Sequence, residues 1–341
     1  MENPISKFGN KSILLCEDDK IALDYENILN IHYPHKKICY FPAHDSLPFS
    51  SESSSSDILL DRSEKLLSLT NNDIIIITCN NLLKKFQINK DANHFLTLTK
   101  NQTIEANTIL EKLVEFNHSS QANAYNKLEF SLRGDILDIY NSNNNPYRIS
   151  FFDNVIETIK EFNPQTQLTF KDEKERIDIF NPNIELLEPS NKDSYFEDIV
   201  MGYSIYTINR SDIILKEKLN FLKTIFDQVQ PEIPFSNYYL EDNKIKNFKF
   251  TNILSSSPKS LKITLNTSLD EFSKMSNKIY FHSGKNSSSI ENEFHQKKNI
   301  EPNYGNNLYF YKSVISKDYL FDGIVHLNKN THTTKKTNLD T

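Results

Sequence analysis

The sequence predicts an α/β protein, with a parallel-sheet domain, an inserted antiparallel β-rich (α+β) domain and a small C-terminal α/β domain. Two observations predict this fold class. Short apolar runs alternate with stretches of helical period over the first hundred residues, and from about residue 128 the period of the apolar residues changes from 3.6 to 2. A chain of 341 residues has room for two or three domains.

The first part of the chain has the pattern of a parallel sheet. Three short, continuous apolar runs are typical of strands that are buried on both faces: 12–16, 37–41 and 73–79. Residues 19–31 have helical spacing behind an Asp cap, and residues 57–69 repeat that spacing. We expect Cys16, Cys39 and Cys79 on the strands as small buried residues, because their number and spacing fit neither a disulfide scaffold nor a zinc site.

The middle of the chain has the pattern of an antiparallel meander. Four stretches alternate between apolar and polar residues and are separated by turn sequences: 128–132, 136–140, 147–151 and 155–162. A helix is predicted over 212–229. Four strand-like runs follow near the end of the chain: 262–265, 278–281, 307–311 and 323–327.

These patterns divide the chain into five parts. We expect the α/β domain to begin in one segment and to be completed by another after the insertion. The parts are the first segment of the α/β domain (1–96), the inserted domain (97–186), the return segment (187–254), the small α/β domain (259–327) and a polar tail (328–341).

The charge pattern argues against a nucleic-acid surface. The chain has 39 Lys and Arg against 45 Asp and Glu, a net charge of -6, whereas a protein that neutralises phosphates needs a basic face. Within 97–186 there are 9 basic and 14 acidic residues, so the inserted domain favours a protein partner. Apolar runs are too short to cross a membrane and no signal core is seen near the start, so we expect a cytoplasmic protein without membrane contact.

The motifs of nucleotide hydrolysis and of metal binding are absent from the sequence. A phosphate loop needs Gly-x-x-x-x-Gly-Lys-Ser/Thr, and neither of the two Gly-containing candidates, at Gly9 and Gly284, has that spacing. The nine histidines are scattered without a metal-ligand spacing. We therefore expect no catalytic residues, no cofactor and no metal on this chain, and the residues alone favour a binding or scaffold protein.

Several stretches resemble a known family. Residues 41–49 (Phe-Pro-Ala-His-Asp-Ser-Leu-Pro-Phe) and 57–62 are similar to a segment near the start of the bacterial transcription-repair coupling factor family, Mfd. The most specific stretches are similar to the UvrA-interaction domain that this family shares with the excision-repair protein UvrB: 132–140, 146–159 and 162–167. The resemblance implies a UvrB-like fold: a degenerate nucleotide-binding-type domain, the inserted interaction domain and a small α/β domain. The missing phosphate loop is expected of this family and not of UvrB.

The resemblance also implies a partner and a site. In the family, UvrA is contacted by an arginine before a glycine, an arginine after Pro-Tyr and a phenylalanine that closes a Phe-Phe pair, and these match Arg133, Arg148 and Phe152. Arginine is scarce in this chain, with only five residues, so each one is informative. On a meander, two arginines beside an exposed phenylalanine are typical of an interface hot spot.

A structural interpretation of the same three residues stands beside this one. The arginines can pair with aspartates on neighbouring strands, and Phe152 can be part of the core. The aspartates in question are Asp135, Asp138 and Asp153. The residues alone favour this interpretation, and the family resemblance favours the interface.

The resemblance implies the N-terminal module of a transcription-repair coupling factor, a monomer that recruits UvrA to damage at stalled RNA polymerase. RNA polymerase, duplex DNA, ATP and Mg²⁺ would be engaged by polymerase-interacting and translocase domains that this chain lacks, so we expect a fragment, one half of a split gene or a remnant. The alternatives are a UvrB-type ATP-dependent repair helicase, which needs a phosphate loop, and a structural protein without a surviving partner.

Overall fold

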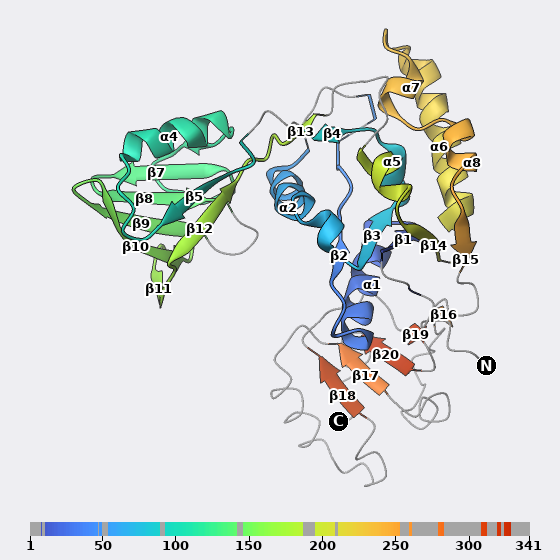
Figure 1. Ribbon diagram of the computed structural model, residues 1–341, viewed down its shortest axis with the longest axis horizontal. Helices are drawn as coiled ribbons and strands as arrows, with labels where there is room; N and C mark the ends of the chain where they lie inside the picture. The colour runs from blue at the N-terminus through green and yellow to red at the C-terminus, as the bar shows by residue number, and fades with distance from the viewer. Residues whose placement is uncertain are drawn as a thin grey trace, which may run out of the picture.

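The computed structural model describes residues 8, 11–46, 48–49, 54–88, 93–141, 146–186, 195–208 and 211–252, together with the backbone of five short strands near the C-terminus. These residues form a mixed α/β protein with both parallel and antiparallel sheets, as the sequence predicts. Figure 1 shows the parallel sheet with its helices in the middle of the view and a separate β-rich unit beside it.

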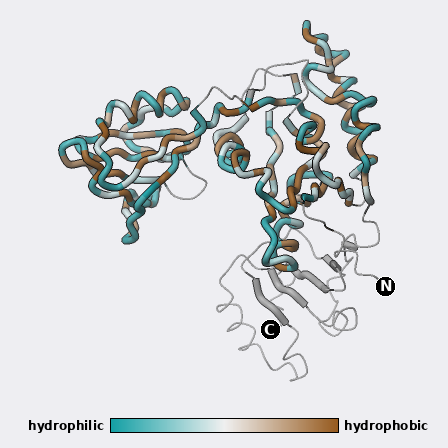
Figure 2. The backbone as a smooth tube through the Cα atoms, in the orientation of Figure 1, coloured by the Kyte–Doolittle hydropathy of each residue, from teal (hydrophilic) through white to brown (hydrophobic). Residues whose placement is uncertain are grey.

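The first sheet is parallel and has the strand order β15-β14-β1-β3-β2. The strands are β1 (Ser12–Cys16), β2 (Ile38–Tyr40), β3 (Ile74–Thr78), β14 (Ser204–Thr207) and β15 (Phe250–Asn252). Every residue of β1 and β3 is buried, because apolar clusters cover both faces of the sheet. This burial explains the continuous apolar runs, and hydrophobic residues are concentrated along these strands in Figure 2.

Helices pack against both faces of the parallel sheet. One face is covered by α1 (Asp19–His32), which begins after Asp18, whose carboxylate accepts a 2.8 Å hydrogen bond from the Ile21 amide. This confirms the expected Asp cap. The other face is covered mainly by three helices, α3 (Cys79–Leu83), α5 (Tyr195–Val200) and α6 (Ser211–Val229), the last of which confirms the helix predicted over 212–229.

The remaining helices complete this part of the chain. They are α2 (Ser56–Leu66), which confirms the second predicted helix with an earlier end, α7 (Phe235–Tyr238) and α8 (Asp242–Lys246). One detail of the prediction is wrong, because β3 ends at Thr78 and Cys79 is the first residue of α3. The Cys79 thiol lies 3.4 Å from the carbonyl oxygens of Cys16 and Ser211, so it is still a buried packing residue.

The second sheet is formed by the middle of the chain and has the strand order β11-β10-β9-β8-β7-β6. Four antiparallel strands confirm the meander: β7 (Glu129–Arg133), β8 (Ile136–Tyr140), β9 (Tyr147–Phe152) and β10 (Val155–Phe162). The structure adds a short parallel strand at one edge, β6 (Ser119–Ser120), and an antiparallel strand at the other, β11 (Thr169–Glu173).

One face of this sheet is covered and holds a core. Helix α4 (Ala106–Glu115) and the antiparallel pair of β5 (Phe95–Thr99) with β12 (Arg176–Phe180) supply apolar side chains that pack against those of β7 to β10. We call β5 to β12 together with α4 the inserted unit. The chain enters and leaves it side by side, because β4 (Gln87–Ile88) pairs with β13 (Glu185–Leu186) (Figure 1).

The C-terminal region contributes a third sheet of order β16-β19-β20-β17-β18, with parallel and antiparallel pairs. Its strands are β16 (Lys259–Ser260), β17 (Ile279–His282), β18 (Leu308–Tyr311), β19 (Tyr319–Phe321) and β20 (Ile324–Asn328). Three of them confirm predicted strands. The strand expected at 262–265 and the tail beyond residue 328 lie outside the described residues, and the five domain boundaries stay a prediction.

A helix that crosses a bilayer needs about 20 consecutive, mostly apolar residues. Within the ranges that the structure describes, no helix is long and apolar enough to do so.

Candidate protein-interaction site

The structure brings the three predicted site residues to one face of the six-stranded sheet. Arg148 lies directly opposite Asp138, and Ile136 lies opposite both Arg133 and Ser150. Because side chains alternate along a strand, Arg133, Asp138, Arg148 and Phe152 all project from the same face. The opposite face packs against α4 and the β5–β12 pair.

Asp138 lies at the centre of this face and binds both arginines. Its side chain has no exposed surface. The Arg148 guanidinium donates from Nε to Oδ1 at 2.6 Å and from Nη2 to Oδ2 at 2.8 Å, and Arg133 Nη2 donates to Oδ2 at 2.6 Å. The two-bond geometry with Arg148 is the strong form of an arginine–carboxylate pair. The sequence named Asp138 only as one of three possible partners, and the register selects it.

Arg148 is held from several sides. Its Nη1 donates to the Gln167 carbonyl oxygen at 2.9 Å, and its guanidinium carbon lies 4.6 Å from the centre of the Phe162 ring. The side chain is 20% exposed. The hydrogen bonds to Asp138 raise the pKa of Arg148, so this cation is fixed in place and always charged.

Arg133 is more accessible than Arg148. Its side chain is 45% exposed, and besides Asp138 its guanidinium contacts the Asn123 side chain. Arg133 is followed by Gly134, whose φ of +58° in the β7–β8 turn suits glycine. The ion-pair interpretation of the two arginines is therefore correct as geometry, and it leaves part of both side chains at the surface.

Phe152 is an exposed aromatic side chain at the end of β9. It is 69% exposed, whereas the preceding Phe151 is 8% exposed and packs in the core. The two turn residues that follow, Asp153 and Asn154, have φ values of 45° and 63°, as a two-residue hairpin of type I′ requires. The interpretation of Phe152 as a core residue is wrong.

Phe152 and Arg133 lie at the same end of the sheet, where β9 and β7 end. The Phe151 amide donates to the Asp135 carbonyl oxygen at 2.9 Å, which places the turn after Arg133 beside the end of β9. On the same face Ile136 is 39% exposed, so an apolar surface adjoins the arginines. An aromatic ring, an aliphatic side chain and partly exposed guanidinium groups together are typical of protein interfaces. We call Arg133, Ile136, Arg148 and Phe152 the outer patch.

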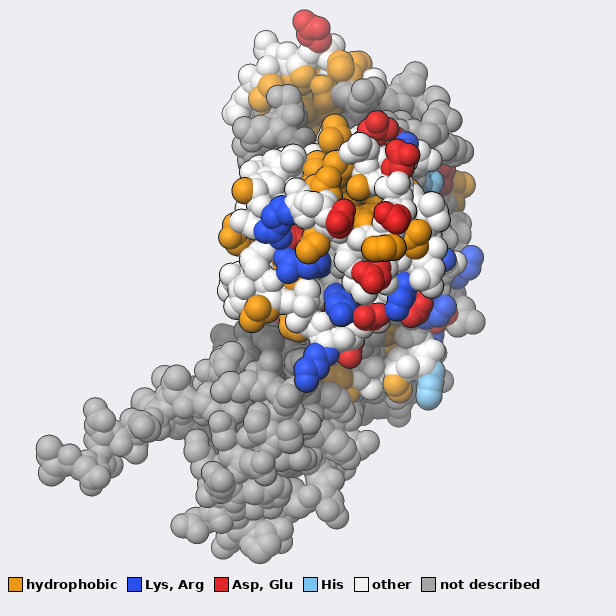
Figure 3. Space-filling view, turned by 90° about the vertical axis from the view of Figure 1, so that its left-hand side faces the viewer, with side chains coloured by type: hydrophobic (Ala, Val, Ile, Leu, Met, Phe, Trp, Pro, Cys, Tyr) orange, Lys and Arg blue, Asp and Glu red, His pale blue; other side chains and the backbone are white. Residues whose placement is uncertain are grey.

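The surroundings of the outer patch are mixed in charge. Beside it on β10 and β11, Lys160 and Glu173 form a 3.3 Å ion pair. Arg176, the third arginine of this region, pairs with Asp178 on β12 instead. Figure 3 looks onto the end of the inserted unit far from the parallel sheet, where basic, acidic and apolar side chains are interspersed. Neither sign of charge dominates, which argues against an extended phosphate-binding surface.

The inserted unit is similar to a known class of domain. Residues 96–187 match the family of the UvrB interaction domain. The match covers the inserted unit from the second residue of β5 and continues through β13, so the sheet that carries the outer patch is similar to this class of domain.

A larger part of the chain is similar to transcription-repair-coupling factors. The protein of Rickettsia bellii is 29% identical over 212 residues, which is 61% of this chain and 18% of the relative. That of Rickettsia conorii is 32% identical over 172 residues (48% and 15%), and that of Staphylococcus haemolyticus 27% over 224 residues (64% and 17%). The resemblance stated from the sequence is confirmed. The chain spans about a sixth of the length of these relatives.

Proposed function

We propose that this chain is a UvrA-docking module of a transcription-repair coupling factor and that it acts in transcription-coupled nucleotide excision repair by protein–protein contact. The outer patch is the docking surface. The observation that carries the proposal is the exposure of Phe152 on the same sheet face as Arg133 and Arg148, the three positions at which the family resemblance predicts the UvrA contact.

The geometry supports a hot spot for physical reasons. An exposed phenylalanine gains free energy when a partner covers it, because about 25 cal/mol is released per Å² of apolar surface removed from water. Asp138 fixes both guanidinium groups before binding, so fewer rotamers are lost on association. Arginine and aromatic residues are the types that most often dominate interface energies.

The relatives extend well beyond the part that matches this chain, which is about a sixth of their length. We propose that RNA polymerase, duplex DNA, ATP and Mg²⁺ are engaged by regions of a coupling factor beyond the matched part, and that the module itself is a monomer without ATPase activity. Glu17, Asp18 and Asp19 follow β1, and carboxylates at the end of a strand repel a nucleotide phosphate. This supports the degenerate UvrB-like assignment over the UvrB-type helicase.

The proposal is tested by binding of the purified chain to UvrA from the same source, measured by biolayer interferometry. We expect a dissociation constant in the micromolar range or tighter, and a loss of about tenfold or more for Phe152→Ala and for Arg133→Ala. Two control variants have the same chemistry away from the outer patch: Phe170→Ala on β11, where the ring is 43% exposed, and Arg176→Ala on β12. Equal binding by the native chain and by a variant with Arg133, Arg148 and Phe152 all replaced by alanine would refute the proposal.

A further inference from the structure

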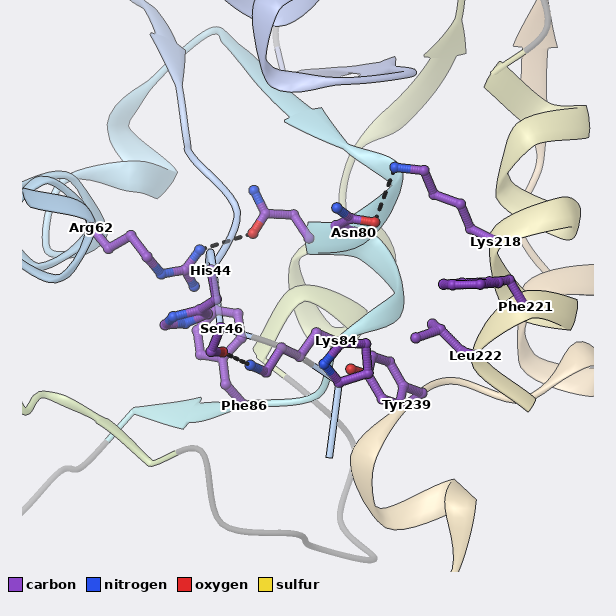
Figure 4. A pocket seen from close by; sticks show the side chains of 12 residues that line it. His44, Ser46, Arg62, Asn80, Lys84, Phe86, Lys218, Phe221, Leu222 and Tyr239 are labelled. Atoms are coloured by element: carbon purple, nitrogen blue, oxygen red, sulfur yellow. Dashed lines mark hydrogen bonds between the residues drawn. The ribbon is translucent and has the colours of Figure 1, made fainter. Parts of the chain in front are cut away.

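A second site candidate lies in the parallel-sheet part of the chain, far from the outer patch in sequence. A cavity of about 290 Å³ lies beyond the carboxyl ends of β2 and β3, between the segment that follows β2, helix α3 and helix α6 (Figure 4). In open α/β sheets, ligands bind at the carboxyl ends of the parallel strands. The lining residues are dispersed along the chain, so no single sequence motif marks this cavity.

The lining of the cavity is basic. Four side chains of the lining are cationic or titrate as bases: His44, Arg62, Lys84 and Lys218. No aspartate or glutamate is among the described residues that line the cavity. Figure 4 shows Lys218 and Lys84 on different walls, with Phe221 and Leu222 pointing into the space from α6.

Two of the four basic groups bind a buried carboxylate outside the lining, Glu185. It neutralises the Arg62 guanidinium, whereas burial and the Arg62 charge lower the pKa of His44 to about 4, so that this imidazole carries no charge near neutral pH. Arg62 has no exposed side-chain surface, and its Nε and Nη2 donate to Glu185 at 2.7 and 2.6 Å. His44 Nε2 lies 3.1 Å from the same carboxylate, and its Nδ1 lies 2.9 Å from the Ser54 hydroxyl. These groups hold the wall together and keep few donors for a ligand.

The other two basic groups have no carboxylate partner in the described part of the chain. Lys84 Nζ donates to the Ser46 hydroxyl at 3.1 Å, and Lys218 Nζ donates to Asn80 Oδ1 at 3.0 Å. Each ammonium group has three donors, so both keep donors that are not used by these partners. Two positive charges therefore face one cavity without a salt-bridge partner among the described residues.

The electrostatic environment of Lys84 is unfavourable for its charge. Burial and the nearby Arg62 guanidinium lower the pKa of Lys84 to about 8, although Glu185 and Asp45 act in the opposite direction. An anion in the cavity would offset both unfavourable effects. The apolar part of the wall favours a ligand that also carries an apolar group, because Phe221 lines the cavity and is 62% exposed.

We propose that this cavity binds a small phosphate monoester, with the phosphate dianion between Lys84 and Lys218 and its organic group against Phe221. Two lysines without a salt-bridge partner match a dianion in charge, and lysine binds phosphate as a point charge. The volume lies near the lower end of ligand pockets, which suits a phosphate with one small ring. The site is independent of the UvrA contact.

The test is isothermal titration calorimetry of the chain with three probes at constant ionic strength: phenyl phosphate, inorganic phosphate and benzoate. We expect saturable binding of phenyl phosphate, weaker binding of inorganic phosphate, and no binding of benzoate. Lys84→Met and Lys218→Met should each weaken phenyl phosphate binding by about tenfold or more. Phe221→Ala should weaken phenyl phosphate and leave inorganic phosphate unchanged. Lys216→Met, an exposed position of α6 outside the lining, is the matched control.

A second readout separates a specific site from a loss of fold. At pH 8, binding should be accompanied by proton uptake as the anion raises the pKa of Lys84, so the measured enthalpy should depend on the ionisation enthalpy of the buffer in the native chain and not in Lys84→Met. If that variant unfolds, Lys218→Met and Phe221→Ala still decide. Absence of saturation by phenyl phosphate, equal binding of benzoate, or unchanged binding in both lysine variants would overturn the proposal.

Discussion

Replacement of Asp138 tests whether one buried carboxylate organises the outer patch. The side chain is fully buried and forms three hydrogen bonds to two guanidinium groups, at 2.6, 2.6 and 2.8 Å. Removing one partner of a buried ion pair costs about 3–5 kcal/mol. Because Arg133 is 45% exposed, water can replace part of the hydrogen bonding that its guanidinium loses with the carboxylate. We therefore expect Asp138→Ala to lower the free energy of unfolding by about 3 kcal/mol, the lower end of that range.

The assay is urea unfolding followed by far-UV circular dichroism, with amide hydrogen exchange in β8 and β9 to locate the loss. With a urea dependence of about 1–3 kcal/mol/M, the expected change shifts the midpoint by about 1 M or more. Asp135→Asn, an exposed aspartate in the adjacent turn, should stay within about 0.5 kcal/mol. If Asp138→Ala is as stable as Asp135→Asn, with unchanged exchange in both strands, the carboxylate does not hold the arginines.

Three further predictions concern other parts of the chain. Burial lowers the pKa of His118 to about 4, so the unfolded chain binds a proton between about pH 6.5 and 4 that the folded chain does not. As the pH falls over that range, His118 should contribute up to about 3 kcal/mol to the loss of stability, beside a similar contribution from His44, whose pKa is also lowered to about 4. In urea unfolding measured against pH, His118→Gln should remove the first contribution, and the exposed His35→Gln should not. Glu185→Gln leaves Arg62 buried without its carboxylate and should cost about 3–5 kcal/mol in thermal unfolding, whereas the double change with Arg62→Met should cost less. A coupled assay should detect no saturable ATP hydrolysis by the purified chain, and hydrolysis that saturates with ATP would contradict the degenerate-domain assignment.

Much of the fold could be predicted because its elements have clear periodicity. Strands β1 and β3 are buried on both faces, and a short, continuous apolar run bounded by turn residues is the pattern that such strands require. Strand β11 has the opposite character: all five of its residues are exposed, so no apolar alternation marks it, and only pairing with β10 makes it a strand. Helix α4 does have a helical spacing of apolar residues in the sequence, because its buried Ile109 and Leu113 lie four residues apart.

The candidate site was predictable in its residues and not in its geometry. Phe151 and Phe152 are the same type of residue, and only the register of β9 assigns Phe151 to the core and Phe152 to the surface. The same register places Asp138, and not Asp135 or Asp153, opposite Arg148. The Arg62–Glu185 pair joins residues 123 positions apart, a distance over which a single sequence carries no pairing signal.

The structural and docking interpretations of the outer patch now predict different results for the same variants. If the sheet face is only structural, Arg148→Ala lowers stability and Phe152→Ala changes nothing, because the Phe152 ring is mostly in water. If the face docks UvrA, Phe152→Ala leaves urea unfolding unchanged and weakens binding by about tenfold or more. Asp138→Asn separates the two further. Its effect on UvrA binding should disappear when Arg133 and Arg148 are already replaced by alanine, because the carboxylate acts on the partner only through the guanidinium groups that it positions.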